Sequence, residues 1–173
     1  RREFSDELNA GLAARFGTAS DVTLKDHFIA RPDGSELRVR IYRKTGSTAR
    51  GALLYVHGGG MIVSCIEDYD ARCMHYCTNT GIPVVSVDYP LAPESPYPAQ
   101  IDDALTALSW MHASSTEFGW DRDRIGICGD SAGGGLTAGK ILCLARRLEG
   151  FLQLFLRGSG ELSSFSTTQD HES

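Results

Sequence analysis

The sequence lacks any apolar run near the roughly 20 residues that cross a bilayer, so no membrane span is expected. It also lacks an excess of basic residues, because 17 lysines and arginines stand against 22 acidic residues, for a formal net charge of −5. Without a basic surface, a nucleic-acid partner is not expected. What remains is the composition of one globular domain, in which 42% hydrophobic residues can supply a core.

Cysteines are few, odd in number and irregularly spaced. They are Cys65, Cys73, Cys77, Cys128 and Cys143. This pattern does not suggest a disulfide framework, so reduced thiols and a cytoplasmic location are expected. Cys73, His75 and Cys77 resemble a metal cluster, but on a helix positions 73 and 77 share a face and position 75 points elsewhere, so no metal is expected.

Short apolar runs alternate with helical patterns through most of the chain. Strands are expected at 52–56, 84–87 and 125–128, and helices near 68–78, 99–114 and from 132 to about 149. Such alternation implies crossover connections, and therefore a predominantly parallel sheet with helices on both faces. The expected fold class is α/β.

The amino-terminal part has a different pattern. Residues 3–15 place apolar side chains at helical spacing, and residues 22–30 and 36–43 alternate as strands around the turn Pro32-Asp33-Gly34. A short amphipathic helix followed by a β-hairpin is expected.

The expected organisation is a lid-like helix at 1–20, a core at 21–157 and a polar tail at 158–173. Residues 151–156 fit one more strand. The tail is rich in serine, threonine, glycine and charged residues, so it is expected to be disordered.

The segment Gly129-Asp130-Ser131-Ala132-Gly133 fits Gly-x-Ser-x-Gly between a strand pattern and a helix pattern. In this context the serine lies on a strained turn that lifts its hydroxyl above the sheet edge, and small neighbours avoid collisions with the strand and helix. Ser131 is therefore the candidate nucleophile.

His57-Gly58-Gly59-Gly60 directly follows the first of these apolar strands. Successive glycines allow backbone N–H groups to point into one cavity and to bind a developing oxyanion, with the N–H of Ala132 as the partner donor. An isolated Gly-Gly-Gly would more simply be a flexible turn. The later Gly-x-Ser-x-Gly pattern favours the oxyanion interpretation.

With a third segment, Asp88-Tyr89-Pro90-Leu91-Ala92-Pro93-Glu94 followed by Tyr97-Pro98-Ala99, the chain resembles the hormone-sensitive-lipase-like branch of the α/β-hydrolase fold. That branch is marked by His-Gly-Gly-Gly and Gly-Asp-Ser-Ala-Gly-Gly. The resemblance covers residues 22–147 and so only the amino-terminal portion of the family's fold, which implies a truncated α/β-hydrolase fold.

The resemblance implies a carboxylic ester hydrolase that uses a serine acyl-enzyme, acts on a small ester and needs no cofactor or metal. Ser131 would attack the ester carbonyl, and the N–H groups of Gly59, Gly60 and Ala132 would hold the oxyanion. His57 is expected to shape the loop and is not assigned as the base.

Other motif residues are expected to be structural. They are His57, Gly58, Gly129, Asp130 and Gly133. The Asp88 segment is interpreted as scaffold beside the active site. Two departures from the family pattern are Pro90, where arginine is usual, and Gly135, where asparagine is common.

The family's triad acid and base come from separate loops after the nucleophile. After Ser131 this sequence has only the adjacent Asp170 and His171, which are interpreted as a solvated terminus. The other histidines are interpreted as surface or core residues; they are His27, His75 and His112. The chain is therefore expected to be impaired in catalysis and to expose a sheet edge through which it associates. Loss of resemblance after Arg147 fits a truncated product, an altered splice form or a gene-model error.

A non-catalytic ligand-binding or receptor-like module on the same fold is the alternative. Saturable binding without turnover would favour this alternative, whereas esterase activity that is lost on Ser131→Ala would favour the enzyme.

Overall fold

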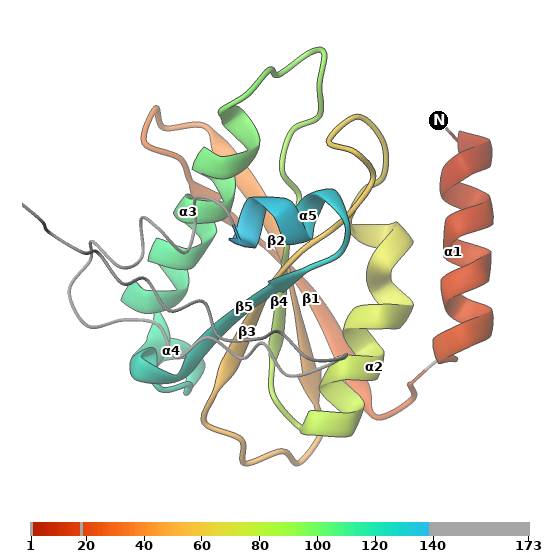
Figure 1. Cartoon of the computed structure of the whole chain (residues 1–173). Coiled ribbons are helices and arrows are strands. Elements are labelled where there is room, and N and C mark those ends of the chain that lie inside the picture. The colour runs from red at the N-terminus through yellow and green to blue at the C-terminus, as the bar shows by residue number, and fades with distance from the viewer. Residues whose placement is uncertain (1, 18, 139–173) are drawn as a thin grey trace, which may run out of the picture.

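The structure is a computed structural model, and it describes residues 2–17 and 19–138 (Figure 1). The helices are α1 (Arg2–Phe16), α2 (Asp70–Thr80), α3 (Ala99–Ala113), α4 (Ser115–Phe118) and α5 (Ala132–Leu136), with 3-10 turns η1 (Ile66–Tyr69) and η2 (Arg122–Arg124). The strands are β1 (Val22–Ala30), β2 (Glu36–Lys44), β3 (Ala52–Val56), β4 (Val84–Val87) and β5 (Ile125–Gly129).

The five strands form one mixed sheet in the order β1-β2-β4-β3-β5. Strand β3 pairs in parallel with β4 and β5, as expected for strands joined by crossover helices. The hairpin of β1 and β2 joins antiparallel, because β2 runs opposite to β4. The predicted α/β class, with a hairpin added to a parallel unit, is confirmed.

Helices cover both faces of the sheet, as predicted. Successive strand residues point to opposite faces, so Leu54 and Val56 pack toward α3, while Tyr55 and Val84 pack toward α2 and α1. Figure 1 shows α1 and α2 on one side of the sheet and α3 on the other, with α5 beside the end of β5. Ser131 lies where β5 ends and α5 begins.

Several local details were not predicted. The helix expected from residue 68 begins as the 3-10 turn η1, and neither α4 nor η2 was expected. Only the start of the helix predicted for 132–149 is described. The strand predicted at 151–156 and the tail at 158–173 lie outside the described residues. No helix in the described part of the chain is both long and apolar enough to cross a membrane.

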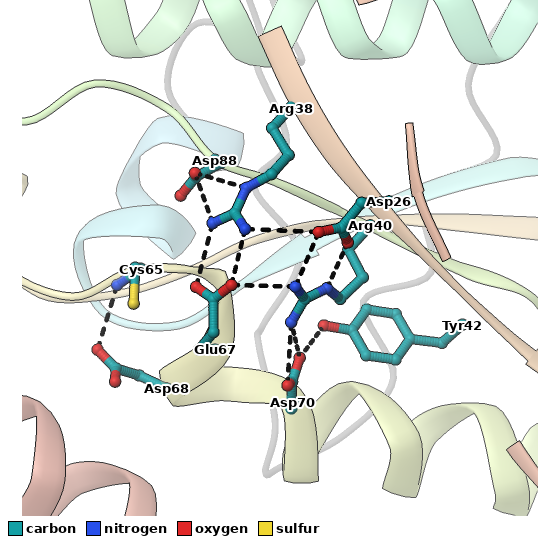
Figure 2. A network of polar contacts seen from close by, with 9 residues as sticks. All are labelled: Asp26, Arg38, Arg40, Tyr42, Cys65, Glu67, Asp68, Asp70 and Asp88. Atoms are coloured by element: carbon teal, nitrogen blue, oxygen red, sulfur yellow. Dashed lines mark hydrogen bonds and ion pairs between the residues drawn. The ribbon is translucent and has the colours of Figure 1, made fainter. Parts of the chain in front are cut away.

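Two arginines on β2 join the hairpin to the rest of the fold through a network of ion pairs (Figure 2). Their carboxylate partners are Asp26 on β1, Glu67 on η1, Asp70 at the start of α2 and Asp88 after β4. Arg38 and Arg40 share one face because side chains alternate along a strand. The four carboxylates outnumber the two guanidinium groups, but Glu67 and Asp70 lie in first helical turns, where free N–H groups favour negative charge.

Glu67 makes the stability of this network depend on pH. Burial raises the pKa of Glu67, but hydrogen bonds from Arg38, from its own backbone N–H and from Cys65 outweigh burial. The resulting pKa is about 2. Because the folded pKa lies below the ordinary value of 4.5, the carboxylate stabilises the fold above pH 4.5, and this contribution is lost as the pH falls toward 2.

We therefore expect Glu67→Gln to reduce the loss of stability between pH 6 and pH 3. The measurement is the free energy of unfolding from urea titrations at both pH values. Glu67 is 42% exposed, so solvent screening keeps the effect to roughly 1 kcal/mol or less. If Glu67→Gln lost as much free energy of unfolding between pH 6 and pH 3 as the parent does, Glu67 would not be the source of the pH dependence.

Candidate active site

Ser131 sits on a strained turn between β5 and α5. Its backbone has φ 48° and ψ −115°, in a region that non-glycine residues rarely adopt. Asp130 before it donates its N–H to the carbonyl of Val56 at 3.3 Å, and Gly133 donates to the carbonyl of Asp130 at 2.8 Å. The serine side chain is exposed, so the turn presents a hydroxyl to solvent while its flanks are anchored.

The glycines on either side of Ser131 lie against backbone. A Cβ added at Gly133 would be 2.1 Å from the carbonyl oxygen of Val56, and one at Gly129 would be 2.6 Å from the same oxygen. Any side chain at either position would push β5 and α5 away from β3. The expectation that small residues are required beside the nucleophile has this physical basis.

The loop after β3 passes directly beside this turn. A Cβ added at Gly58 would lie 3.5 Å from the Cβ of Ser131 and 3.0 Å from the carbonyl oxygen of Asp130. The next residues have positive φ, 110° at Gly59 and 62° at Gly60. The structure thus brings the two glycine-rich motifs together, although they are distant in sequence.

Three backbone N–H groups around Ser131 and the glycine loop have no hydrogen-bond acceptor in the described part of the chain. Within the described residues, the N–H groups of Gly59, Gly60 and Ala132 donate to no protein acceptor. The carbonyl of Gly59 accepts from Ile62 and Val63 at 3.1 and 3.0 Å, which closes the loop on itself. Unpaired amides on a loop and a helix start can bind negative charge.

His57 is fully buried inside this loop. Its Nδ1 lies 2.8 Å from the carbonyl oxygen of Gly58, and its ring stacks on that of Tyr89 at 4.1 Å between centroids. The ring of Tyr69, on η1, also stacks on the His57 ring, with the two centroids 5.8 Å apart. Desolvation lowers the pKa of His57, so the ring is neutral near pH 7. These contacts hold the loop in position.

The Asp88 segment supports the same loop. Asp88 pairs with Arg38 at 2.8 Å, and the N–H of Ala92 donates to the carbonyl of Met61 at 2.8 Å. The hydroxyl of Tyr89 donates to the carbonyl of His57 at 2.8 Å. The segment therefore connects the hairpin network to the glycine loop.

Arg72 is the residue that sequence reasoning missed. It lies on α2 and forms an ion pair with Asp130, next to Ser131. Arg72 follows Tyr69 by three positions and precedes Tyr76 by four, so it shares their helix face, and both tyrosines pack toward the sheet. A charged residue on this otherwise apolar face was the one signal in the sequence that Arg72 has a buried partner. No local motif predicts its partner.

The remaining histidines of the described chain lie elsewhere. His27 on β1 packs edge-on against Phe118 at 5.2 Å between centroids, and His75 packs on Phe16 at 4.9 Å. His112 lies on α3. The triad acid and base considered from the sequence, Asp170 and His171, lie outside the described residues.

A groove of about 1090 Å³ lies between the hairpin turn and α3. Its walls include Arg31, Pro90 and Asp103, and Ser131 and the three loop glycines are not among its lining residues. This groove is therefore separate from the nucleophile turn and the free amides.

Comparisons with known proteins agree with this geometry. The family described as the alpha/beta hydrolase fold matches residues 53–170. Ethyl acetate hydrolase of Pseudomonas putida is 38% identical over 142 residues, which are 79% of this chain and 43% of that protein. The carboxylic ester hydrolase LipN of Mycobacterium tuberculosis is 42% identical over 132 residues, 76% of this chain and 34% of that protein.

Solved structures give the same result. An arylesterase structure has a TM-score of 0.77 at 34% identity and covers 89% of this chain and 50% of its own. A bacterial heroin esterase structure has a TM-score of 0.78 at 32% identity, and the match covers 87% of this chain and 47% of that one. The chain spans less than half the length of the curated relatives that it matches.

Proposed function

This chain belongs to the hormone-sensitive-lipase-like branch of the α/β-hydrolase fold, and from that premise we propose that it carries the nucleophile half of a carboxylic ester hydrolase. The supporting observation is the position of Ser131 on a strained turn beside the glycine loop, where the amides of Gly59, Gly60 and Ala132 are free. An exposed hydroxyl on a strained turn, close to a loop with free N–H donors, suits acyl transfer.

In the proposed reaction, the Oγ of Ser131 attacks the ester carbonyl carbon as a base takes its proton. The carbonyl oxygen becomes an oxyanion held by the three N–H groups, and the alkoxide leaves with a proton, giving an acyl-enzyme that water hydrolyses. One such donor typically lowers the barrier by about 3 to 4 kcal/mol. The substrate class is a small carboxylic ester.

We also propose that these 173 residues alone turn over slowly. After Ser131 the only aspartate and histidine are the adjacent Asp170 and His171, and neighbours on the chain are poorly suited to act as an acid that orients a base over the serine. Without that base, the hydroxyl is a weak nucleophile, and the free amides would supply most of the remaining catalysis.

The test is covalent labelling with a fluorophosphonate, read by intact-protein mass spectrometry. We expect one adduct on Ser131, none on Ser131→Ala, and slow formation. Burial outweighs the opposing effect of Arg72 and raises the pKa of the Cys128 thiol to about 12. This cysteine therefore stays protonated and does not compete with Ser131 for the label. Equal labelling of the Ser131→Ala variant would place the nucleophile elsewhere.

A chimera tests the hydrolase assignment itself. The segment of ethyl acetate hydrolase that follows its serine turn would replace residues 139–173, and p-nitrophenyl acetate would be the substrate. We expect hydrolysis that Ser131→Ala abolishes. A folded chimera that binds the ester without hydrolysing it would favour the ligand-binding alternative instead.

A further inference from the structure

Arg72 connects helix α2 to the turn that carries Ser131. Its Nη1 pairs with Oδ2 of Asp130, and both side chains are largely buried, at 17% and 23% exposure. Asp130 is the residue between the end of β5 and Ser131, and its backbone is already bonded to Val56 and Gly133. With the ion pair, side chain and backbone are both restrained.

Such restraint is needed because Ser131 has an unfavourable backbone conformation. A non-glycine residue at φ 48° and ψ −115° is strained and persists only where its surroundings hold it. If Asp130 could rotate, the turn could relax and the hydroxyl would leave its position beside the amides. The ion pair to Arg72 opposes that rotation.

The amino-terminal helix also contacts the Arg72 guanidinium. The Cζ of Arg72 lies 4.9 Å from the ring centroid of Phe16, the last residue of α1. The same ring packs against His75 at 4.9 Å, so the end of α1 is seated on α2. Among the described residues, the buried Nε of Arg72 has no hydrogen-bond partner, and the guanidinium is restrained by the Phe16 ring, by the Asp130 carboxylate and by a side-chain hydrogen bond with Tyr76.

We propose that Arg72 is a positioning residue for the nucleophile turn and that docking of α1 through Phe16 holds it in place. Seating the ring over the guanidinium excludes water and directs the cation at Asp130. When α1 leaves, water reaches Arg72, its pairing with Asp130 weakens, and the turn carrying Ser131 loosens. The helix would thus control the reactivity of the serine without touching it. This consequence for reactivity rests on the proposed function of Ser131.

Amide hydrogen exchange of the full 173-residue chain tests the coupling directly. The amides to follow are those of Asp130 and Gly133, which report the two backbone bonds of the turn. We expect Phe16→Leu, which keeps an apolar side chain but removes the ring, to speed their exchange by about threefold to tenfold. Amides of β1 should not change.

The matched control is Phe118→Leu. Phe118 also lies over an arginine, Arg43, at 6.0 Å, but it packs on α3 and β1 and makes no contact with the turn. It should leave the exchange of Asp130 and Gly133 unchanged. Equal effects of the two variants, or no effect of Phe16→Leu, would overturn the proposal.

Two further variants separate positioning from simple stability. Arg72→Met should speed exchange at the turn by at least about tenfold, and adding Phe16→Leu to it should have no further effect, because both act through one contact. Arg72→Lys keeps a charge for Asp130 and should restore most of the protection. Additive effects of Phe16→Leu and Arg72→Met would contradict the shared route.

Fluorophosphonate labelling of the same variants links the coupling to chemistry. The rate at Ser131 should fall in the order wild type, Arg72→Lys, Phe16→Leu, Arg72→Met. A wild-type chain that takes no label would count against Ser131 as an activated nucleophile. The exchange rates would still decide whether Phe16 and Arg72 hold the turn.

Discussion

Replacing Gly133 with alanine is expected to lower the free energy of unfolding by at least about 3 kcal/mol. The new Cβ would lie 2.1 Å from the carbonyl oxygen of Val56 and 2.4 Å from that of His57. Both are backbone atoms of the sheet end and of the glycine loop, so no side-chain rotation can relieve the contact. The turn at Ser131 should open, and labelling by fluorophosphonate should be lost with it.

The matched control is Gly135→Ala in the same helix. A Cβ there meets nothing within 4 Å, and glycine inside a helix costs about 1 kcal/mol relative to alanine. We expect this variant to be more stable than the parent by about 0.5 to 1 kcal/mol. Urea titrations of both variants measure the contrast, and a destabilised Gly135→Ala would show that the start of α5 is crowded where the structure leaves space.

The second large effect is expected for Arg40→Met, which should destabilise the fold by about 2 to 3 kcal/mol. Arg40 binds Asp26 through two hydrogen bonds of 2.6 and 2.9 Å, Asp70 through two of 3.0 and 3.1 Å, and Glu67 through one of 3.0 Å. Methionine would leave these carboxylates close together without their cation. Because Asp26 and Asp70 are 30% and 25% exposed, water limits the loss.

Arg40→Lys and salt separate charge from geometry. Lysine keeps the positive charge but cannot fork between two carboxylates, so we expect it to recover about half of the lost stability. The measurement is the unfolding midpoint in urea with and without 0.5 M sodium chloride. Salt screens the repulsion among the carboxylates, so it should bring the midpoint of Arg40→Met closer to that of the parent. If Arg40→Met were as stable as the parent, the network would be only a surface feature.

Much of the fold was predictable because it follows from local pattern. Strands β3, β4 and β5 were found within one residue, since short apolar runs between helical patterns have few other solutions. The hairpin was equally predictable from the alternation of its residues around Pro32-Asp33-Gly34. The mixed sheet was harder to predict, because no local pattern indicates that β2, paired with β1 on one side, pairs with β4 on the other.

The sequence by itself predicted the two glycine-rich motifs of the candidate site. Gly-x-Ser-x-Gly and His-Gly-Gly-Gly are short, and their glycines are required by contacts with the adjoining strand and helix, so the chemistry can be read in chain order. The order of motifs also identified the family. Both conclusions depend on neighbours in sequence and on steric rules that hold in any fold of this type.

Only the tertiary structure decided what holds that site in place. The pairing of Arg72 with Asp130, the cover provided by Phe16, and the burial of His57 between Tyr69 and Tyr89 join segments that are far apart in the chain. Partners of this kind are set by packing, because a charged or aromatic side chain can meet whichever group the fold brings within a few ångströms. No periodicity or motif encodes that choice.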